Sequence, residues 1–215
     1  MSELSFFVTG AQAERYAAAP QLSLRVRVAE TSGVPVYAMT LRAQVRIEPQ
    51  LRRYDEGESD RLHELFGGPE RYGDTLKSLL WTHVSQTVLS FDGDTEFDLT
   101  IPCSYDFEVA AHKYLAALRG GEIPLIVMFS GTVFVRGADG GVQAELVPWS
   151  SEARFRLPVD VWRDTMDAHF PNSAWLRIDR ATFDELYRFK VAGGFTTWEA
   201  ALARLAADAR TLRHG

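Results

Sequence analysis

The stretch from Ile123 to Trp149 constrains the fold more than any other part of this sequence. An almost unbroken apolar run, Ile123 to Val135, is followed by a turn rich in Gly at 137–141 and by an alternating run that starts at Val142. Gly and Asp tolerate the positive backbone angles that a tight reversal needs, so this pattern predicts a β-hairpin. Because the first arm shows little alternation, we expect it to be covered on both faces and to form the centre of a sheet.

Alternating segments elsewhere predict further strands. Leu22–Val28 alternates apolar with polar residues, and Tyr37–Ile47 does the same after a turn at Thr31-Ser32-Gly33. We expect these two segments to pair as an antiparallel hairpin with one solvated face. Other strands are expected at residues 4–8, 79–91 and 97–101, and the second arm of the central hairpin is expected to continue past Pro148 to Leu157.

Helical periodicity gathers mostly late in the chain. From Val159 to Phe170 the apolar side chains share one side and the acidic ones the other, which predicts an amphipathic helix that Pro158 opens. A further helix is expected at 106–120, and two more are expected after the capping boxes Thr182 with Glu185 and Thr196 with Glu199. Residues 49–78 are expected to form a surface excursion, which contains a short helix at 59–66 capped by Ser59.

Together these segments predict an α+β protein. We expect a mainly antiparallel β-sheet of about six or seven strands, with the helices packed on it. A chain of 215 residues can form one domain. Since no linker or repeat divides the sequence, we expect a single domain over residues 1–215, with residues 196–215 as a C-terminal helix.

Charge and terminal composition exclude several classes of protein. The net charge of −6 argues against nucleic acid as the main partner, since phosphate binding needs a basic surface. The N-terminal MSELSFFVTG has neither the basic leader nor the apolar core of a signal peptide. No window approaches the roughly 18 apolar residues of a membrane span. A soluble cytoplasmic protein is therefore expected.

No catalytic or cofactor motif is present in the sequence. Ser130 lacks the leading glycine of a nucleophile elbow. Cys103 is the sole cysteine, which excludes an internal disulfide and a cysteine zinc site, although a helix beginning after it could lower its thiol pKa. On a helix His169 lies well round from Asp164 and Asp167, which favours a solvated acidic face over a metal site. We expect no catalytic residue, no metal ligand and no cofactor.

Three aromatic residues of the central hairpin are candidates for protein binding. Trp149 stands beside Pro148 in an expected strand, where a large side chain can face a ligand. Phe134, in the first arm, and Phe155, in the continuation of the second, complete the candidate set.

Several short segments resemble the export chaperone SecB. The pattern from Pro20 to Ile47 looks like the first two strands of that family. The segments Cys103-Ser-Tyr-Asp-Phe-Glu108 and Leu118-Arg-Gly-Gly-Glu-Ile-Pro-Leu125 are similar to its helix, its Arg-Gly-Gly turn and the start of its next strand, and Thr182–Tyr187 resembles part of its last helix. The resemblance implies a SecB-like core, here with an additional hairpin and C-terminal helices, and clients held through exposed apolar surface.

Over its whole length the chain more closely resembles an uncharacterised actinobacterial family. The segments MFSGTVFV, LVPWSSEARFRLPVDVWRDTMDAHFP and WLRIDRATFDELYRFK carry this similarity. Genes of that family often lie among those for nickel–iron hydrogenases. The resemblance therefore implies an accessory role, with a hydrogenase subunit or one of its maturation factors as the client.

The leading hypothesis is a non-catalytic, chaperone-like binding protein that holds a segment of a protein client. Binding would use edge-strand pairing and an apolar groove between sheet and helices. The alternatives are an enzyme with an unfamiliar site, using Asp164 and Asp167 or Cys103, and a structural subunit of a larger complex. Clustered titratable groups in a deep pocket would favour the enzyme, and an open apolar groove the binder. The sequence does not decide between a monomer and an oligomer.

Overall fold

The computed structural model describes residues 3–104, 109–137, 140–171, 173 and 178–213. The chain divides into two compact units, residues 1–174 and residues 175–215. Each unit is described by itself, so the single domain expected over residues 1–215 stays a prediction.

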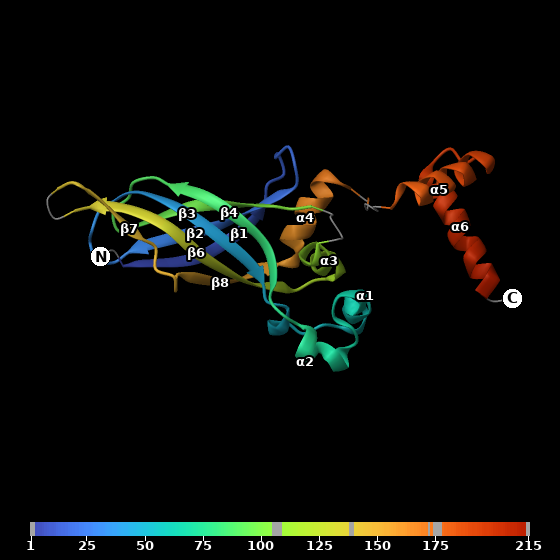
Figure 1. Cartoon of the computed structure of the whole chain (residues 1–215), viewed down its shortest axis with the longest axis horizontal. Coiled ribbons are helices and arrows are strands. Elements are labelled where there is room, and N and C mark those ends of the chain that lie inside the picture. The colour runs from blue at the N-terminus through green and yellow to red at the C-terminus, as the bar shows by residue number, and fades with distance from the viewer. Residues whose placement is uncertain (1–2, 105–108, 138–139, 172, 174–177, 214–215) are drawn as a thin grey trace. The chain divides into compact units, whose positions relative to one another are not determined.

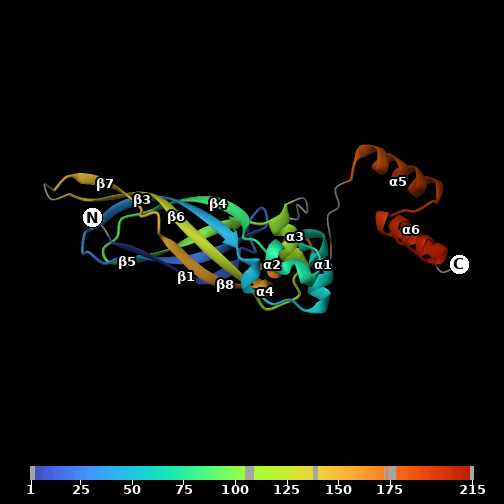
Figure 2. The same cartoon turned by 60° about the horizontal axis from the view of Figure 1, so that its bottom comes forward.

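The larger unit is built from two antiparallel sheets (Figures 1 and 2). Sheet A has the order β1 (Leu4–Ala13), β2 (Gln21–Glu30), β5 (Asp94–Pro102). Sheet B has the order β4 (Leu79–Val88), β3 (Val36–Ile47), β6 (Glu122–Arg136), and the far side of β6 pairs with both β7 (Val142–Leu146) and β8 (Glu152–Pro158). The expected α+β class with a mainly antiparallel sheet is confirmed, although the strands form two sheets instead of one.

The core lies between these sheets because each strand turns one apolar face inward. The inward side chains of β2, Leu22, Leu24, Val26 and Val28, are fully buried, and those of β3 and β6 alternate in the same way. The rings of Phe6 in sheet A and Phe129 in sheet B stack with centroids 4.3 Å apart.

The hairpin expected between residues 22–28 and 37–47 is wrong. β2 pairs with β1 and β5, whereas β3 pairs with β4 and β6, so the two segments lie in different sheets. Alternation shows that one face of a strand is buried. It does not show whether two such strands are neighbours in one sheet or face each other across the core from two sheets. The loop that joins the sheets is held by Glu30, whose carboxylate accepts the backbone N–H groups of Ser32 and Val34.

Strand β6 is the centre of sheet B, as expected. It pairs with β3 along one side from Val36↔Val135 to Ile47↔Leu125. At Gly131 the backbone φ is +143°, and a Cβ there would lie 2.0 Å from the carbonyl oxygen of Thr40, so this glycine permits close approach of β3. Two expectations fail. The outer face of β6 is partly open, with Met128 38% exposed, and the second arm is interrupted between β7 and β8.

The helices of the larger unit gather at one end of its strands (Figure 2). They are η1 (Pro49–Leu51), α1 (Glu56–Phe66), η2 (Pro69–Arg71), α2 (Tyr72–Thr75), α3 (Ala110–Ala117) and α4 (Val159–His169). Helix α4 buries Val159, Trp162 and Met166 and exposes its aspartates, as predicted. The N-cap of α1 is Asp55 instead of Ser59, and Asp55 accepts the N–H of Glu58. The start of the helix expected at 106–120 lies partly outside the described residues.

Segment 49–78, expected as a surface excursion, is anchored to the rest of the unit. Leu62 and Phe66 of α1 are buried in the core. Arg52 forms a buried ion pair with Glu58 at 2.5 Å and donates to the carbonyl oxygens of Gly120 and Glu122. These bonds fasten α1 to the turn that precedes β6.

The described part of the second unit holds two helices, α5 (Arg180–Ala192) and α6 (Trp198–Arg213). Both predicted caps are displaced: the N-cap of α5 is Asp179, three residues before Thr182, whose N–H it accepts, and Thr197, one residue after Thr196, accepts the N–H of Ala200. The two helices meet through an aromatic cluster of Phe183, Tyr187 and Trp198.

Candidate protein-binding surface

The three aromatic residues singled out from the sequence lie in different settings. Phe134 is on the outer face of sheet B, where it is half-buried and pairs with Ala144 of β7. Trp149 is 92% exposed in the turn that joins β7 to β8. Phe155 alternates inward on β8 and packs against the core.

These residues do not form one site. Phe155 pairs with Leu125, nine residues along β6 from Phe134, which corresponds to about 30 Å of extended strand. The rings of Phe134 and Phe155 also belong to opposite faces of sheet B, because one occupies an outward and the other an inward position. Phe134 lies toward the C-terminal end of β6, Trp149 lies beside the middle of that strand, between the Val147 and Ser151 backbone bonds to β6, and Phe155 belongs with the core.

Strand β7 adds apolar side chains that the sequence reasoning did not assign to a face. The register pairs Leu146 with Thr132 and Val142 with Arg136, which places them on the outer face with Phe134. Leu146 is 81% exposed and Val142 is 66% exposed. We name Phe134, Val142, Ala144 and Leu146 the β7 face. The alternation of Val-Gln-Ala-Glu-Leu signalled it, but only the register shows that the apolar side points outward.

The β7 face borders an open sheet edge. Among the described strands, β7 pairs with β6 alone, so no described strand pairs with its other side. Such an edge can add a strand from another chain, with side-chain contacts from the neighbouring face supplying selectivity. The exposed Trp149 follows β7 by three residues and stands at this same edge.

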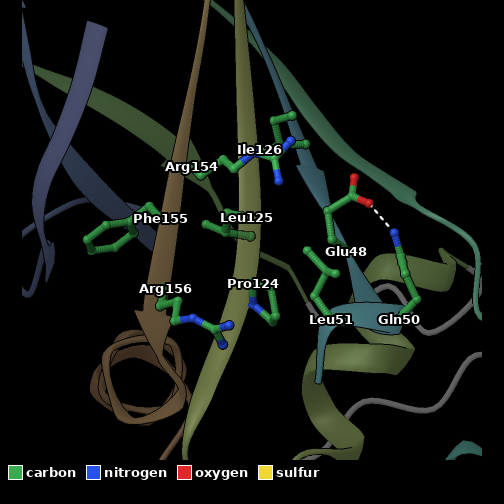
Figure 3. Close-up of a pocket in the computed structure, with 9 residues that line it drawn as sticks. All are labelled: Glu48, Gln50, Leu51, Pro124, Leu125, Ile126, Arg154, Phe155 and Arg156. Carbon is green, nitrogen blue, oxygen red and sulfur yellow. Dashed lines mark hydrogen bonds between the residues drawn. The ribbon is translucent and has the colours of Figure 1, made fainter. Parts of the chain in front are cut away.

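A pocket of about 590 Å³ opens at the other end of β6 (Figure 3). It is lined by residues from three separate segments: Glu48, Gln50, Leu51, Pro124, Leu125, Ile126, Arg154, Phe155 and Arg156. This pocket lies beside β6, β8 and η1, and the apolar groove expected between sheet and helices stays a prediction.

Cys103 has the environment of an unreactive thiol. Burial raises its pKa to about 12, and its Sγ donates to the carbonyl oxygen of Ile101 at 3.7 Å. A nucleophilic cysteine needs a thiolate near neutral pH, so this environment opposes nucleophilic chemistry at Cys103.

The acidic face of α4 has partners other than a metal. Asp164 lies 3.6 Å from the guanidinium of Arg15. The ring nitrogens of His169 lie 3.0 Å and 2.9 Å from the carbonyl oxygens of Thr165 and Ala17. In the described part of the chain, no three His, Cys, Asp or Glu side chains gather as a metal site would require.

One Ser–His pair was missed by the sequence reasoning. The Oγ of Ser104 lies 3.0 Å from Nδ1 of His112 on α3. The residues are eight positions apart, across the segment that leads into the helix, and no familiar motif spans them. This geometry is the feature of the described chain that most favours an enzyme.

Within the described ranges, no helix combines the length and apolarity needed to cross a bilayer. The fold and surface thus define an α+β protein with an open apolar sheet edge. The chain belongs to a family of unknown function, DUF6084, whose model matches residues 1–214. Among the curated proteins, none matches the sequence.

Solved structures show distant similarity. The CARDB domain of a Pyrococcus furiosus protein, solved in complex with di-metal ions, is 9% identical with a TM-score of 0.28, and the alignment covers 73% of this chain and 92% of that one. A β-glucosidase from Kluyveromyces marxianus is 8% identical with a TM-score of 0.27, covering 72% and 15%. β-Glucosidase 3B from Thermotoga neapolitana, with bound α-D-glucose, is 14% identical with a TM-score of 0.26, covering 72% and 17%. Similarities of this extent carry no inference about function.

Proposed function

We propose that this protein is a non-catalytic, chaperone-like accessory protein that holds an extended segment of a protein client on the β7 face. The observation that carries the proposal is the exposure of Leu146, Val142 and Trp149 beside an open strand edge. Apolar side chains grouped at an edge are a feature of protein-binding surfaces, because water contact there is unfavourable until a partner covers them.

The proposed mode of binding is strand addition. A client segment would pair its backbone with the open side of β7, and its side chains would pack on Phe134 and Leu146. The resemblance to SecB supports a chaperone-like role. The resemblance to a family encoded near hydrogenase genes supports a hydrogenase subunit or maturation factor as the client.

Affinity purification of a tagged copy from hydrogenase-expressing cells, followed by mass spectrometry, tests this function. We expect the wild-type protein to recover a hydrogenase-related client and Leu146→Glu to lose it. Trp149→Ala should weaken binding by a factor of about 30 or more if Trp149 is a hot spot. The matched control is Tyr16→Glu, which changes a fully exposed aromatic residue in the β1–β2 loop and should keep the client.

Two outcomes contradict parts of the proposal. If the wild type recovers proteins unrelated to hydrogenase and Leu146→Glu does not recover them, the hydrogenase client is rejected but the β7 face remains the binding surface. Equal recovery by the wild type and both β7-side variants rejects the surface.

An enzyme is the second candidate, favoured by the Ser104–His112 pair. A fluorophosphonate probe labels serines that a base activates. The binding function predicts that the native protein takes up no label. Labelling that disappears in Ser104→Ala but persists in Ser130→Ala would favour the enzyme.

A further inference from the structure

The pocket at the β8 end of sheet B has one strongly cationic wall. Arg154 and Arg156 occupy alternate positions of β8, so both point to the outer side while Phe155 points inward (Figure 3). Side chains two residues apart on a strand are separated by about 7 Å. Ile126 lies beside the two arginines in the pocket, and Leu51, which is 50% exposed, lines it from η1.

The acidic residue of the pocket does not neutralise this wall. Oε1 of Glu48 accepts from Oγ of Ser78 at 2.5 Å, and Oε2 accepts from the side-chain amide of Gln50. Arg46 donates to the same Ser78 hydroxyl at 2.8 Å, which links Glu48 to a cation outside the pocket.

The two arginines are left without strong partners. Arg154 has a contact of 3.4 Å with Glu152, and the side chain of Arg156 makes no hydrogen bond or ion pair with any residue that the structure describes. A guanidinium stays protonated at every physiological pH, so both are permanent cations. Their forked donors fit carboxylates, and the neighbouring apolar groups can pack against the methylene groups of a bound side chain.

We propose that Arg154 and Arg156 bind two carboxylates of an acidic segment of the client, arranged as Glu-x-Glu in an extended chain. This inference rests on the proposed function and names the chemistry of its client. An extended peptide places alternate side chains about 7 Å apart, which equals the spacing of the two arginines on β8.

The β7 face and this pocket share the outer side of sheet B. Ile126 and Phe134 are eight residues apart on β6, or about 26 Å of strand. A client segment of about eight to ten residues can therefore reach from one to the other. It would carry apolar side chains at the β7 end and the acidic pair at the β8 end.

Fluorescence anisotropy with two labelled peptides tests the proposal. The first peptide is Val-Leu-Val-Ser-Gly-Ser-Ser-Glu-Leu-Glu, and the second has Gln in place of both Glu. We expect the wild-type protein to bind the Glu peptide about five- to twentyfold more tightly than the Gln peptide, as two partly exposed ion pairs allow. The difference should shrink with added salt.

Variants of exposed arginines separate the pocket from a general charge effect. The double variant Arg154→Gln, Arg156→Gln should bind both peptides equally. The matched control, Arg42→Gln with Arg136→Gln, changes two exposed arginines of sheet B outside the pocket and should keep the preference for Glu. Circular dichroism checks that all variants fold.

Three results would overturn the proposal: no binding of the Glu peptide at millimolar concentration, equal binding of both peptides by the wild type, or a preference for Glu that survives in the Arg154, Arg156 double variant. If both peptides bind equally and Leu146→Glu abolishes both, the acidic-segment inference fails while the proposed function stands. Loss of client recovery in cells, by contrast, tests the proposed function alone.

Discussion

Glu58→Ala is the substitution that most directly tests how segment 49–78 is held. The carboxylate of Glu58 is buried and accepts from Nη2 of Arg52 at 2.5 Å and from the N–H of Arg119 at 2.7 Å. Arg52 itself is nearly buried and donates to the carbonyl oxygens of Gly120 and Glu122. Removing Glu58 leaves the Arg52 guanidinium without its anionic partner and the backbone N–H of Arg119 without its acceptor.

The expected cost follows from this burial. Breaking a buried ion pair by removing one partner costs about 3–5 kcal/mol, because the remaining charge stays desolvated. With a urea m-value near 3 kcal/mol/M, the unfolding midpoint should fall by about 1–1.7 M. The surface control is Glu64→Ala, which breaks the exposed pair with Lys113 and should cost at most about 1 kcal/mol.

A second variant separates the charge from the packing. Replacing both partners, Arg52→Met with Glu58→Leu, removes the unpaired charge and should recover most of the lost stability. Urea unfolding followed by far-UV circular dichroism measures all four proteins. Equal midpoints for Glu58→Ala and Glu64→Ala would refute the reasoning, since the buried pair would then contribute no more than an exposed one.

The other predictions concern the core, pH and the thiol. Trp162→Ala should lower the free energy of unfolding by about 3–5 kcal/mol, whereas Asp164→Ala, on the opposite side of α4, should change it by no more than roughly 0.5 kcal/mol. Equal losses in urea unfolding would mean that the buried face of the helix is misassigned. Burial raises the pKa of Glu30, but hydrogen bonds from the Ser32 side chain and from three backbone N–H groups outweigh it and hold that pKa below the ordinary 4.5. Its ionised form therefore stabilises the fold above about pH 4.5, and that contribution is lost as the pH falls further. The melting temperature of the wild type should exceed that of Glu30→Gln at pH 7, and this difference should shrink in acid. A constant difference from pH 7 to pH 3 would contradict the prediction. Cys103→Ala should leave client binding unchanged, and iodoacetamide should alkylate the native thiol far more slowly than the unfolded one; rapid native labelling would contradict its burial.

Much of the fold follows from short-range patterns. The turn at 137–141 and the apolar run before it predicted the β6–β7 hairpin, and the spacing of Val159, Trp162 and Met166 predicted the buried side of α4. These features are local, so the residues that decide them are close in sequence. The pairing of β2 with β5 was not predictable in this way, because β5 lies some seventy residues away and the inward face looks the same in either sheet.

The candidate sites depended on longer-range information. The pocket combines residues near positions 50, 125 and 155, and no one of these segments carries a motif. The β7 face depends on a register that pairs Leu146 with Thr132, since a shift of one residue would turn Leu146 toward the core. Trp149 was singled out because it stands beside Pro148 in what the sequence predicts as a strand, whereas the structure places it in the turn between β7 and β8.

The failed expectation about β6 bears on function. Its apolar run predicted a strand covered on both faces. Within the unit of residues 1–174, however, the inward side chains are buried, whereas Met128 is exposed and Ile126 and Phe134 are half-buried. A strand that served the core alone would need apolar residues at alternate positions and could carry polar ones between them. Ile126, Met128 and Phe134 are apolar at the intervening positions, and the proposal gives them a role, because a client segment that reaches from the β7 face to the pocket would cover them.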